Sequence, residues 1–215
     1  MDQEDPALDA IGDDLLSTSE LERANRFRFP RDRRLFRAAH TLLRQTLAGY
    51  LNQPASGIDF VIEAHGRPEL PGRPLRFNMT HTKGLVACVV TAVDDCGVDA
   101  EPIGRHADHT LVAKNVFTDS ERAAIAAVPE SMRTQKFFQF WTLKEAYIKA
   151  RGLGLSLPLR EISFALDEGA PTVTFGPRIQ DEPSLWKFWT GLASVDHHYG
   201  VAVKSDDEMK LEIFR

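Results

Sequence analysis

Three carboxylates and two lysines on two short segments are the residues of this sequence best suited to chemistry. The first segment runs from Gly97 to Glu101 and places Asp99 and Glu101 two residues apart. On a β-strand both side chains project from one face, where two carboxylates repel each other unless a cation lies between them. Because Mg²⁺ prefers oxygen ligands, the segment predicts a magnesium site. The alternative is the exposed face of an edge strand or a turn.

The second segment, Trp141 to Lys149, belongs to a helix predicted over Met132 to Ala150. At 100° per residue, Lys144 falls in the middle of an apolar arc, so its ammonium needs an anion or a path to solvent. Glu145 and Lys149 lie together at the edge of the arc, where the carboxylate can reach a metal and the ammonium a phosphate. The alternative for this i,i+4 pair is an ordinary solvated helix contact. The arc consists of Phe137, Phe140, Trp141, Leu143, Tyr147 and Ile148.

In this order, the two segments resemble the signatures of 4′-phosphopantetheinyl transferases of the large, surfactin-synthetase-activating (Sfp) type. The family motifs Gly-(Val/Ile)-Asp-x-Glu and Trp-x-x-Lys-Glu-(Ala/Ser)-x-x-Lys match residues 97–101 and 141–149 at every fixed position. Upstream, residues 77–82 are similar to the family's Phe-Asn-x-Ser-His-Ser/Thr motif, with Thr80 where serine is usual. The resemblance covers roughly residues 20 to 205.

The resemblance implies that the phosphopantetheine arm of coenzyme A is moved onto a serine of an apo acyl or peptidyl carrier protein, with release of 3′,5′-ADP. Asp99, Glu101 and Glu145 would hold Mg²⁺, or Mn²⁺ in its place, against the pyrophosphate. Glu145, or a water that it orients, would take the serine proton, and Lys149 would neutralise phosphate charge. The expected catalytic residues are therefore Asp99, Glu145 and Lys149. Lys144 has two alternatives, a phosphate contact or a structural pair with Glu101.

Two other functions fit parts of the same pattern. A metal-dependent phosphohydrolase acting on nucleotides can use the same three carboxylates and would need no carrier protein. A noncatalytic module that binds carrier proteins would not need the magnesium ligands at all.

An arginine-rich segment offers partners for the phosphates of coenzyme A. Eight arginines lie between Arg23 and Arg44 against one acid, Asp32, a local balance of +7 in a chain of net charge −5. The guanidinium fork suits phosphate oxygens, and Arg26, Arg31 and Arg34 are the predicted ligands. Helix patterning places Arg37, His40 and Arg44 opposite the expected buried face. That face consists of Leu35, Phe36, Ala39, Leu42, Leu43, Leu47 and Tyr50.

The resemblance adds further positions to the predicted coenzyme A site. Arg67, in His65-Gly66-Arg67-Pro68, looks like the cation of the family's Gly-Lys/Arg-Pro turn, which meets a phosphate. Thr80 and His81 belong to the motif that binds the pyrophosphate, and Lys144 and Lys149 complete the predicted set.

Composition narrows the classes of function. A nucleic-acid-binding role for the arginines is disfavoured because the rest of the chain is acidic and the pI is about 5.8. The first 22 residues contain eight acids and no lysine or arginine, unlike a signal peptide. No apolar stretch is long enough to span a membrane. We therefore expect a cytoplasmic monomer that binds neither nucleic acid nor membranes.

Along the chain, helical and strand patterns alternate without strict βαβ order, which predicts an α+β fold. The resemblance implies two similar α+β halves in a pseudo-twofold arrangement with coenzyme A between them. We divide the chain into an acidic, flexible segment (1–19), an N-terminal half (20–97) and a C-terminal half (98–215) that carries most of the metal site. By analogy, Val116, Phe117 and Met132 are candidate contacts for the carrier protein.

Overall fold

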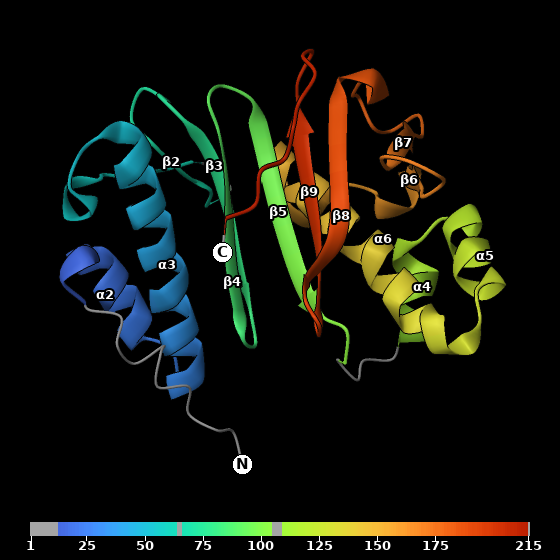
Figure 1. Cartoon of the computed structure of the whole chain (residues 1–215), viewed down its shortest axis with the longest axis horizontal. Helices are drawn as coiled ribbons and strands as arrows, with labels where there is room; N and C mark the ends of the chain where they lie inside the picture. The colour runs from blue at the N-terminus through green and yellow to red at the C-terminus, as the bar shows by residue number, and fades with distance from the viewer. Residues whose placement is uncertain (1–12, 64–65, 105–108, 215) are drawn as a thin grey trace.

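The structure, a computed structural model, describes residues 13–63, 66–104 and 109–214 (Figure 1). Its helices are α2 (Thr18–Asn25), α3 (Pro30–Leu51), α4 (His109–Val116), α5 (Asp119–Ala127) and α6 (Glu130–Arg151). Its strands are β1 (Val61–Ile62), β2 (Pro68–Glu69), β3 (Arg76–Thr82), β4 (Leu85–Thr91), β5 (Asp95–Pro102), β6 (Ile162–Ala165), β7 (Thr172–Phe175), β8 (Trp186–Ser194) and β9 (His197–Lys204). Five short 3₁₀ turns (Asp13–Leu15, Ala55–Gly57, Gly154–Ser156, Leu159–Glu161 and Pro183–Leu185) join them. This mixture of helices and antiparallel strands confirms the predicted α+β class.

The N-terminal part of the chain places one long helix against a β-hairpin. Helix α3 has Pro30 at its first turn, where the missing N–H costs nothing, and ends at Asn52 in the left-handed conformation. It packs on β3 and β4, which pair antiparallel with Thr80 opposite Ala87. Their contact buries a cluster made of Leu43, Leu47, Ile58, Leu70 and Phe77. In Figure 1, α2 and α3 lie on the outer side of this hairpin.

The C-terminal part also packs one long helix against antiparallel strands, here in a larger sheet. Strands β5, β9 and β8 form an antiparallel sheet in that order, and α6 lies across one face of it (Figure 1). The helix approaches the sheet closely because glycines face it: a Cβ on Gly97 would lie 2.1 Å from the carbonyl oxygen of Ala146. On β9, a Cβ on Gly200 would lie 2.5 Å from the backbone of Thr142. The backbone of α6 therefore rests directly on β5 and β9.

The predicted boundary between the two halves of the chain lies within strand β5. Strand β5 pairs with β9 along its whole length, from Asp95↔Lys204 to Pro102↔His197. The predicted boundary between residues 97 and 98 thus falls inside a strand, and we place the division before Asp95. We use "first half" for the described residues up to 94 and "second half" for those from 95 onward. Of the predicted N-terminal segment, residues 1–12 lie outside the described residues, and α2 already begins at Thr18.

The buried face of α3 was predicted incorrectly at its edges. His40 and Arg44 were expected on the solvent side, but they are only 8% and 1% exposed, whereas Tyr50 is 61% exposed. The reason is helix α2: its Glu20 accepts from Arg44 Nε at 2.8 Å and lies 2.8 Å from His40 Nδ1. Helix α2 thus covers a face of α3 that the helical pattern alone assigned to solvent.

Candidate functional site

Strand β5 directs its acidic residues toward α6 by simple alternation. Gly97 faces the helix, so Asp99 and Glu101 project from the same face. Cys96 and Val98 point the other way, into an apolar cluster with Val201 and Val203. The predicted common face for the two carboxylates is therefore present.

Lys149 occupies the centre of the candidate site. Its Nζ lies 2.6 Å from Asp99 Oδ1 and donates to the carbonyl oxygen of Val98 at 3.1 Å. It also donates to the hydroxyl oxygen of Thr80 at 3.1 Å, and that hydroxyl donates in turn to Asp99 Oδ1 at 3.2 Å. Since Thr80 belongs to β3, one ammonium joins β3, β5 and α6. These three elements carry the three motifs identified in the sequence.

The two carboxylate oxygens of Asp99 differ in their hydrogen bonding. Its residue surface is only 5% exposed, and Oδ2 is buried without a hydrogen-bond partner among the described residues. A buried carboxylate oxygen without a donor is costly. This oxygen is therefore suited to accept a ligand such as a cation.

Glu145 lies one helical turn before Lys149 and is half-buried. Burial and the negative charges of Asp99 and Glu101 raise the pKa of its carboxyl to about 7, although Lys149 opposes the change. A carboxyl with a pKa near neutrality can accept and return a proton at physiological pH. Among the described residues, no three His, Cys, Asp or Glu side chains form a ready-made metal cluster. The three predicted ligands share one region, and their mutual repulsion is what a cation would relieve.

Residues 77–82 connect the two halves at this site. Asn78, which sequence reasoning left without a role, accepts from the backbone N–H of Val98 through Oδ1 at 3.1 Å. His81 is the neighbour of Thr80 on β3 and so lies on the opposite face, with its surface exposed. Partial loss of solvent around its ring and the positive charge of Lys149 lower the pKa of His81. Smaller contributions to the pKa of His81 come from the charges of His40 and Asp32 on α3.

Lys144 has neither of its predicted partners in the structure. Its ammonium is fully buried, 2.9 Å from Glu121 Oε2 on α5, and donates to the carbonyl oxygen of Leu159 at 2.8 Å. It also donates to the carbonyl of Ile162. Of the two expected solutions, an anion or a path to solvent, the structure has the anion, but its assignments to a phosphate or to Glu101 are corrected. Glu121 also closes the Thr118-x-x-Glu121 capping box at the start of α5, and a capping pattern gives no sign that its carboxylate pairs with Lys144.

Arg67 is also engaged by the protein itself. Its Nε lies 2.8 Å from Glu69 Oε1, and its Nη1 donates to the carbonyl oxygen of Ala150 at 2.8 Å. Its side chain is 9% exposed. The structure thus does not support the predicted phosphate contact of Arg67.

The three other predicted phosphate ligands lie near the junction of α2 and α3. Arg26 is the exposed C-cap of α2, and Arg31 and Arg34 belong to the start of α3. Arg31 Nε lies 3.7 Å from Asp32 Oδ1. Their assignment to the phosphates of coenzyme A stays a prediction.

The three candidate contacts for the carrier protein differ in solvent exposure. Met132 is 50% exposed and Val116 is half-buried, but Phe117 is fully buried against Phe137 and Phe140. Phe117 is therefore part of the core and is not accessible as a surface contact.

Comparison with known proteins is consistent with this geometry. A family profile described as the 4′-phosphopantetheinyl transferase superfamily matches residues 95–203, from β5 to β9. The 4′-phosphopantetheinyl transferase HetI of Nostoc sp. is 38% identical over 160 residues, which are 73% of this chain and 67% of that protein. The transferase Sfp of Bacillus subtilis is 28% identical over 159 residues, covering 71% of this chain and 67% of Sfp.

Among solved structures, the holo-(acyl-carrier-protein) synthase of Bacillus anthracis matches 52% of this chain and 96% of its own, with 21% identity and a TM-score of 0.42. The profile matches half of the chain, and the matched range includes Asp99, Glu145 and Lys149. This match and the 38% identity to HetI establish the family. This chain belongs to the 4′-phosphopantetheinyl transferase superfamily.

Proposed function

We propose that this protein transfers the 4′-phosphopantetheine arm of coenzyme A to a serine of an apo acyl or peptidyl carrier protein. The observation that carries the proposal is the junction of Thr80, Asp99 and Lys149 beside Glu145, whose pKa is near 7. It combines a proton acceptor, a cation for phosphate and a carboxylate oxygen to which no described residue donates a hydrogen bond. The superfamily membership supports the same reaction.

In the proposed reaction, the serine oxygen forms a bond to the β-phosphorus of coenzyme A, and the bond from that phosphorus to the 3′,5′-ADP oxygen breaks. Glu145, or a water that it orients, accepts the serine proton, for which a pKa near 7 is suitable. Lys149 stabilises the negative charge on the phosphate oxygens as the leaving group departs. Thr80 orients Lys149 through their 3.1 Å hydrogen bond.

Mg²⁺ fits the residues present. Asp99, Glu101 and Glu145 supply only oxygen ligands, and two of these carboxylates raise the pKa of the third. In the described part of the chain, no group donates a hydrogen bond to Asp99 Oδ2. These three residues would hold the ion, which would supply charge neutralisation at the pyrophosphate when bound. Mn²⁺ has the same preference for oxygen and is expected to substitute.

The remaining features of the proposal concern the setting of the reaction. Arg26, Arg31, Arg34 and His81 are proposed to bind the phosphates of coenzyme A from the first half. None of the described helices has the length and apolar character needed to cross a bilayer. We propose that the protein acts in the cytoplasm as a monomer without nucleic acid, which size-exclusion chromatography with light scattering can test in part.

The decisive experiment is intact-mass spectrometry of apo carrier proteins incubated with this protein, coenzyme A and Mg²⁺, with and without EDTA. We expect each accepted carrier to gain one phosphopantetheine group, and EDTA to prevent the gain. Glu145→Gln and Lys149→Gln should each lower the rate by about 100-fold or more, because a proton acceptor or a charge partner is lost.

Exposed residues provide matched controls. Glu208→Gln and Lys210→Gln make the same chemical changes on the C-terminal segment, where both residues are exposed, and should leave the rate within about twofold. Release of free phosphopantetheine without a carrier would favour a phosphohydrolase. Binding of coenzyme A and carrier without any mass gain would favour a noncatalytic module, and either result would overturn the proposal.

A further inference from the structure

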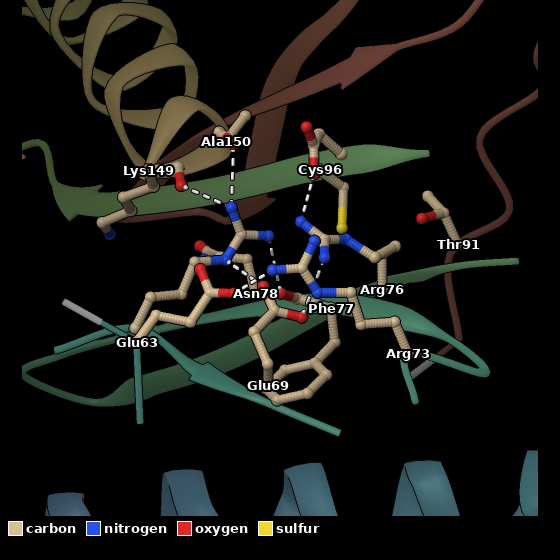
Figure 2. A network of polar contacts seen from close by, with 12 residues as sticks. Glu63, Glu69, Arg73, Arg76, Phe77, Asn78, Thr91, Cys96, Lys149 and Ala150 are labelled. Carbon is tan, nitrogen blue, oxygen red and sulfur yellow. Dashed lines mark hydrogen bonds and ion pairs between the residues drawn. The ribbon is translucent and has the colours of Figure 1, made fainter. Parts of the chain in front are cut away.

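A buried chain of alternating charges links β2 to the end of α6 (Figure 2). Its centre is Glu69, which is 0% exposed and lies between two arginines. Arg67 Nε is 2.8 Å from Glu69 Oε1, and Arg76 Nη1 is 3.2 Å from Oε2. Arg76 also pairs with Asp95, the first residue of β5. The charges on Arg67 and Arg76 thus offset part of the cost of burying Glu69.

The other nitrogens of Arg67 bind backbone carbonyls. Nη1 donates to the carbonyl oxygens of Ala150 at 2.8 Å and Lys149 at 3.4 Å, and Nη2 donates to that of Phe77 at 3.4 Å. Figure 2 shows the network with Glu69 on one side and Lys149 and Ala150, of the last turn of the helix, on the other. The last carbonyls of a helix lack intrahelical donors, and a cation there interacts favourably with the helix dipole. Arg67 therefore caps α6 from a different part of the chain.

The capped turn is the one that carries the reactive groups. Arg67 binds the backbone of Lys149, and the side chain of Lys149 reaches Asp99 Oδ1 at 2.6 Å and Thr80 at 3.1 Å. Glu145 lies one turn earlier on the same helix. A shift at the end of α6 would move both side chains relative to β3 and β5.

We propose that Arg67, oriented by the buried Glu69, is a positioning residue that fixes the last turn of α6 so that Lys149 rests on Asp99 and Thr80. The resemblance described above would instead make Arg67 a ligand of a coenzyme A phosphate. That role would require the guanidinium to leave Glu69, whose pKa burial already raises, without one of its two partners. As far as it concerns the rate of transfer, the inference rests on the proposed function.

The two roles predict opposite kinetics for Arg67→Met, Arg67→Lys and Glu69→Gln. For a positioning residue, kcat falls by about tenfold or more in all three variants, while KM for coenzyme A stays within about threefold. Lysine does not rescue the arginine because one ammonium cannot span Glu69 and two carbonyls. A raised KM for coenzyme A with normal kcat, restored by Arg67→Lys, would identify a phosphate ligand and overturn the inference.

Glu69→Gln separates the roles most cleanly because Glu69 is fully buried and cannot touch a substrate. If Arg67 binds phosphate, the loss of Glu69's charge leaves kcat unchanged. If Arg67 positions α6, kcat falls. Arg178→Met is the matched control, since Arg178 is 71% exposed and pairs with Glu161 at the surface. Should Arg67→Met fail to fold, Arg67→Lys and Glu69→Gln still decide between the roles.

A second readout does not depend on transfer. Deuterium uptake measured by mass spectrometry should rise in peptides covering residues 145–153 in Arg67→Lys and Glu69→Gln, and stay unchanged in peptides of α3. Unchanged uptake at the end of α6 would contradict the positioning role. A wild-type protein without transfer activity would count against the proposed function alone, because the exchange result would still test the contact.

Discussion

Glu145 illustrates how one residue can serve reactivity at the expense of stability. Its carboxyl has a pKa of about 7 against an ordinary value of 4.5, with burial as the main cause. The folded protein therefore holds this proton more tightly than the unfolded chain does. The resulting stabilisation is fully present below pH 4.5 and is lost as pH rises through about 7.

Glu145→Gln should consequently be more stable than the wild type at pH 8 in the presence of EDTA. Glutamine resembles the protonated carboxyl and removes a buried charge that costs up to about 3 kcal/mol. Thermal unfolding should show a midpoint raised by about 3–8 °C at pH 8 and little difference below pH 4.5. Glu208→Gln should show neither effect, and an equal or lower midpoint for Glu145→Gln at pH 8 would contradict the argument.

Whereas the stability contribution of Glu145 falls as pH rises, the rate of transfer should increase with pH. The rate should rise with pH as Glu145 becomes ionised, with an apparent pKa at or below about 7. Bound Mg²⁺ favours the ionised form and should lower this midpoint. A pH–rate profile measured at saturating Mg²⁺ checks this, and a rate that falls between pH 6 and 8 would argue against Glu145 as the proton acceptor.

Sequence reasoning found residue types better than partners. The helical wheel located Lys144 in an apolar arc and so predicted the need for an anion or a path to solvent. It did not identify Glu121, because the pairing depends on how α5 packs against α6. The same limit applies to Arg67, whose contacts at Ala150 lie 83 residues away in the chain. Local patterns fix the direction of a side chain, whereas long-range packing decides what it meets.

At the scale of elements, the contact between α6 and the sheet positions the site. Gly97 and Gly200 let the helix backbone rest on β5 and β9, so that Asp99 on the strand faces Lys149 on the helix. The sequence predicted α6 within two residues at its start and one at its end because its apolar arc is long. It did not predict that β5 pairs with β9, since the partners lie far apart in the chain. Helix α4 was missed as well.

Gly97→Ala and Gly200→Ala should therefore impair both stability and transfer. The added methyl would lie 2.1 Å or 2.5 Å from the helix backbone, which cannot move aside cheaply. We expect a loss of about 3 kcal/mol or more in the free energy of unfolding, measured with urea, and a rate lowered by about 100-fold in the folded fraction. Gly49→Ala is the control: its Cβ would meet nothing within 4 Å on α3, so it should be neutral or slightly stabilising.

At the scale of the whole molecule, hydrogen bonds at separate places join the two halves. On one face, Lys149 and Arg67 join α6 to β3. At the start of β9, His197 Nε2 lies 2.8 Å from the carbonyl oxygen of Lys83 in the β3–β4 turn. On the face away from α6, the segment after Lys204 turns back across β5, as Figure 1 shows.

This returning segment covers part of an apolar groove of about 560 Å³. Met209 and Leu211 pack there on Cys96, Val98, Val201 and Val203, beside Ala87 and Val89 of β4. Met209→Ser and Leu211→Ser should each lower the free energy of unfolding by about 1–3 kcal/mol, as urea titration would show. Ile213→Ser should change it by less than about 0.5 kcal/mol, since Ile213 is 58% exposed. Equal losses in all three variants would mean that the segment is not seated as described.

The order β5-β9-β8 also bears on how the protein emerges from the ribosome. The strand synthesised last, β9, is the central one, so β5 and β8 have no neighbour in their sheet until residue 204 is available. Helix α6 is synthesised earlier, but it cannot pack against Gly200 until β9 has been synthesised. A nascent chain must therefore carry the faces of β5 and α6 that pack on β9 uncovered until β9 is made, about 100 and 50 residues later, which favours chaperone contact. A premature stop codon before β9 is expected to yield not a weakened enzyme but an unfolded second half.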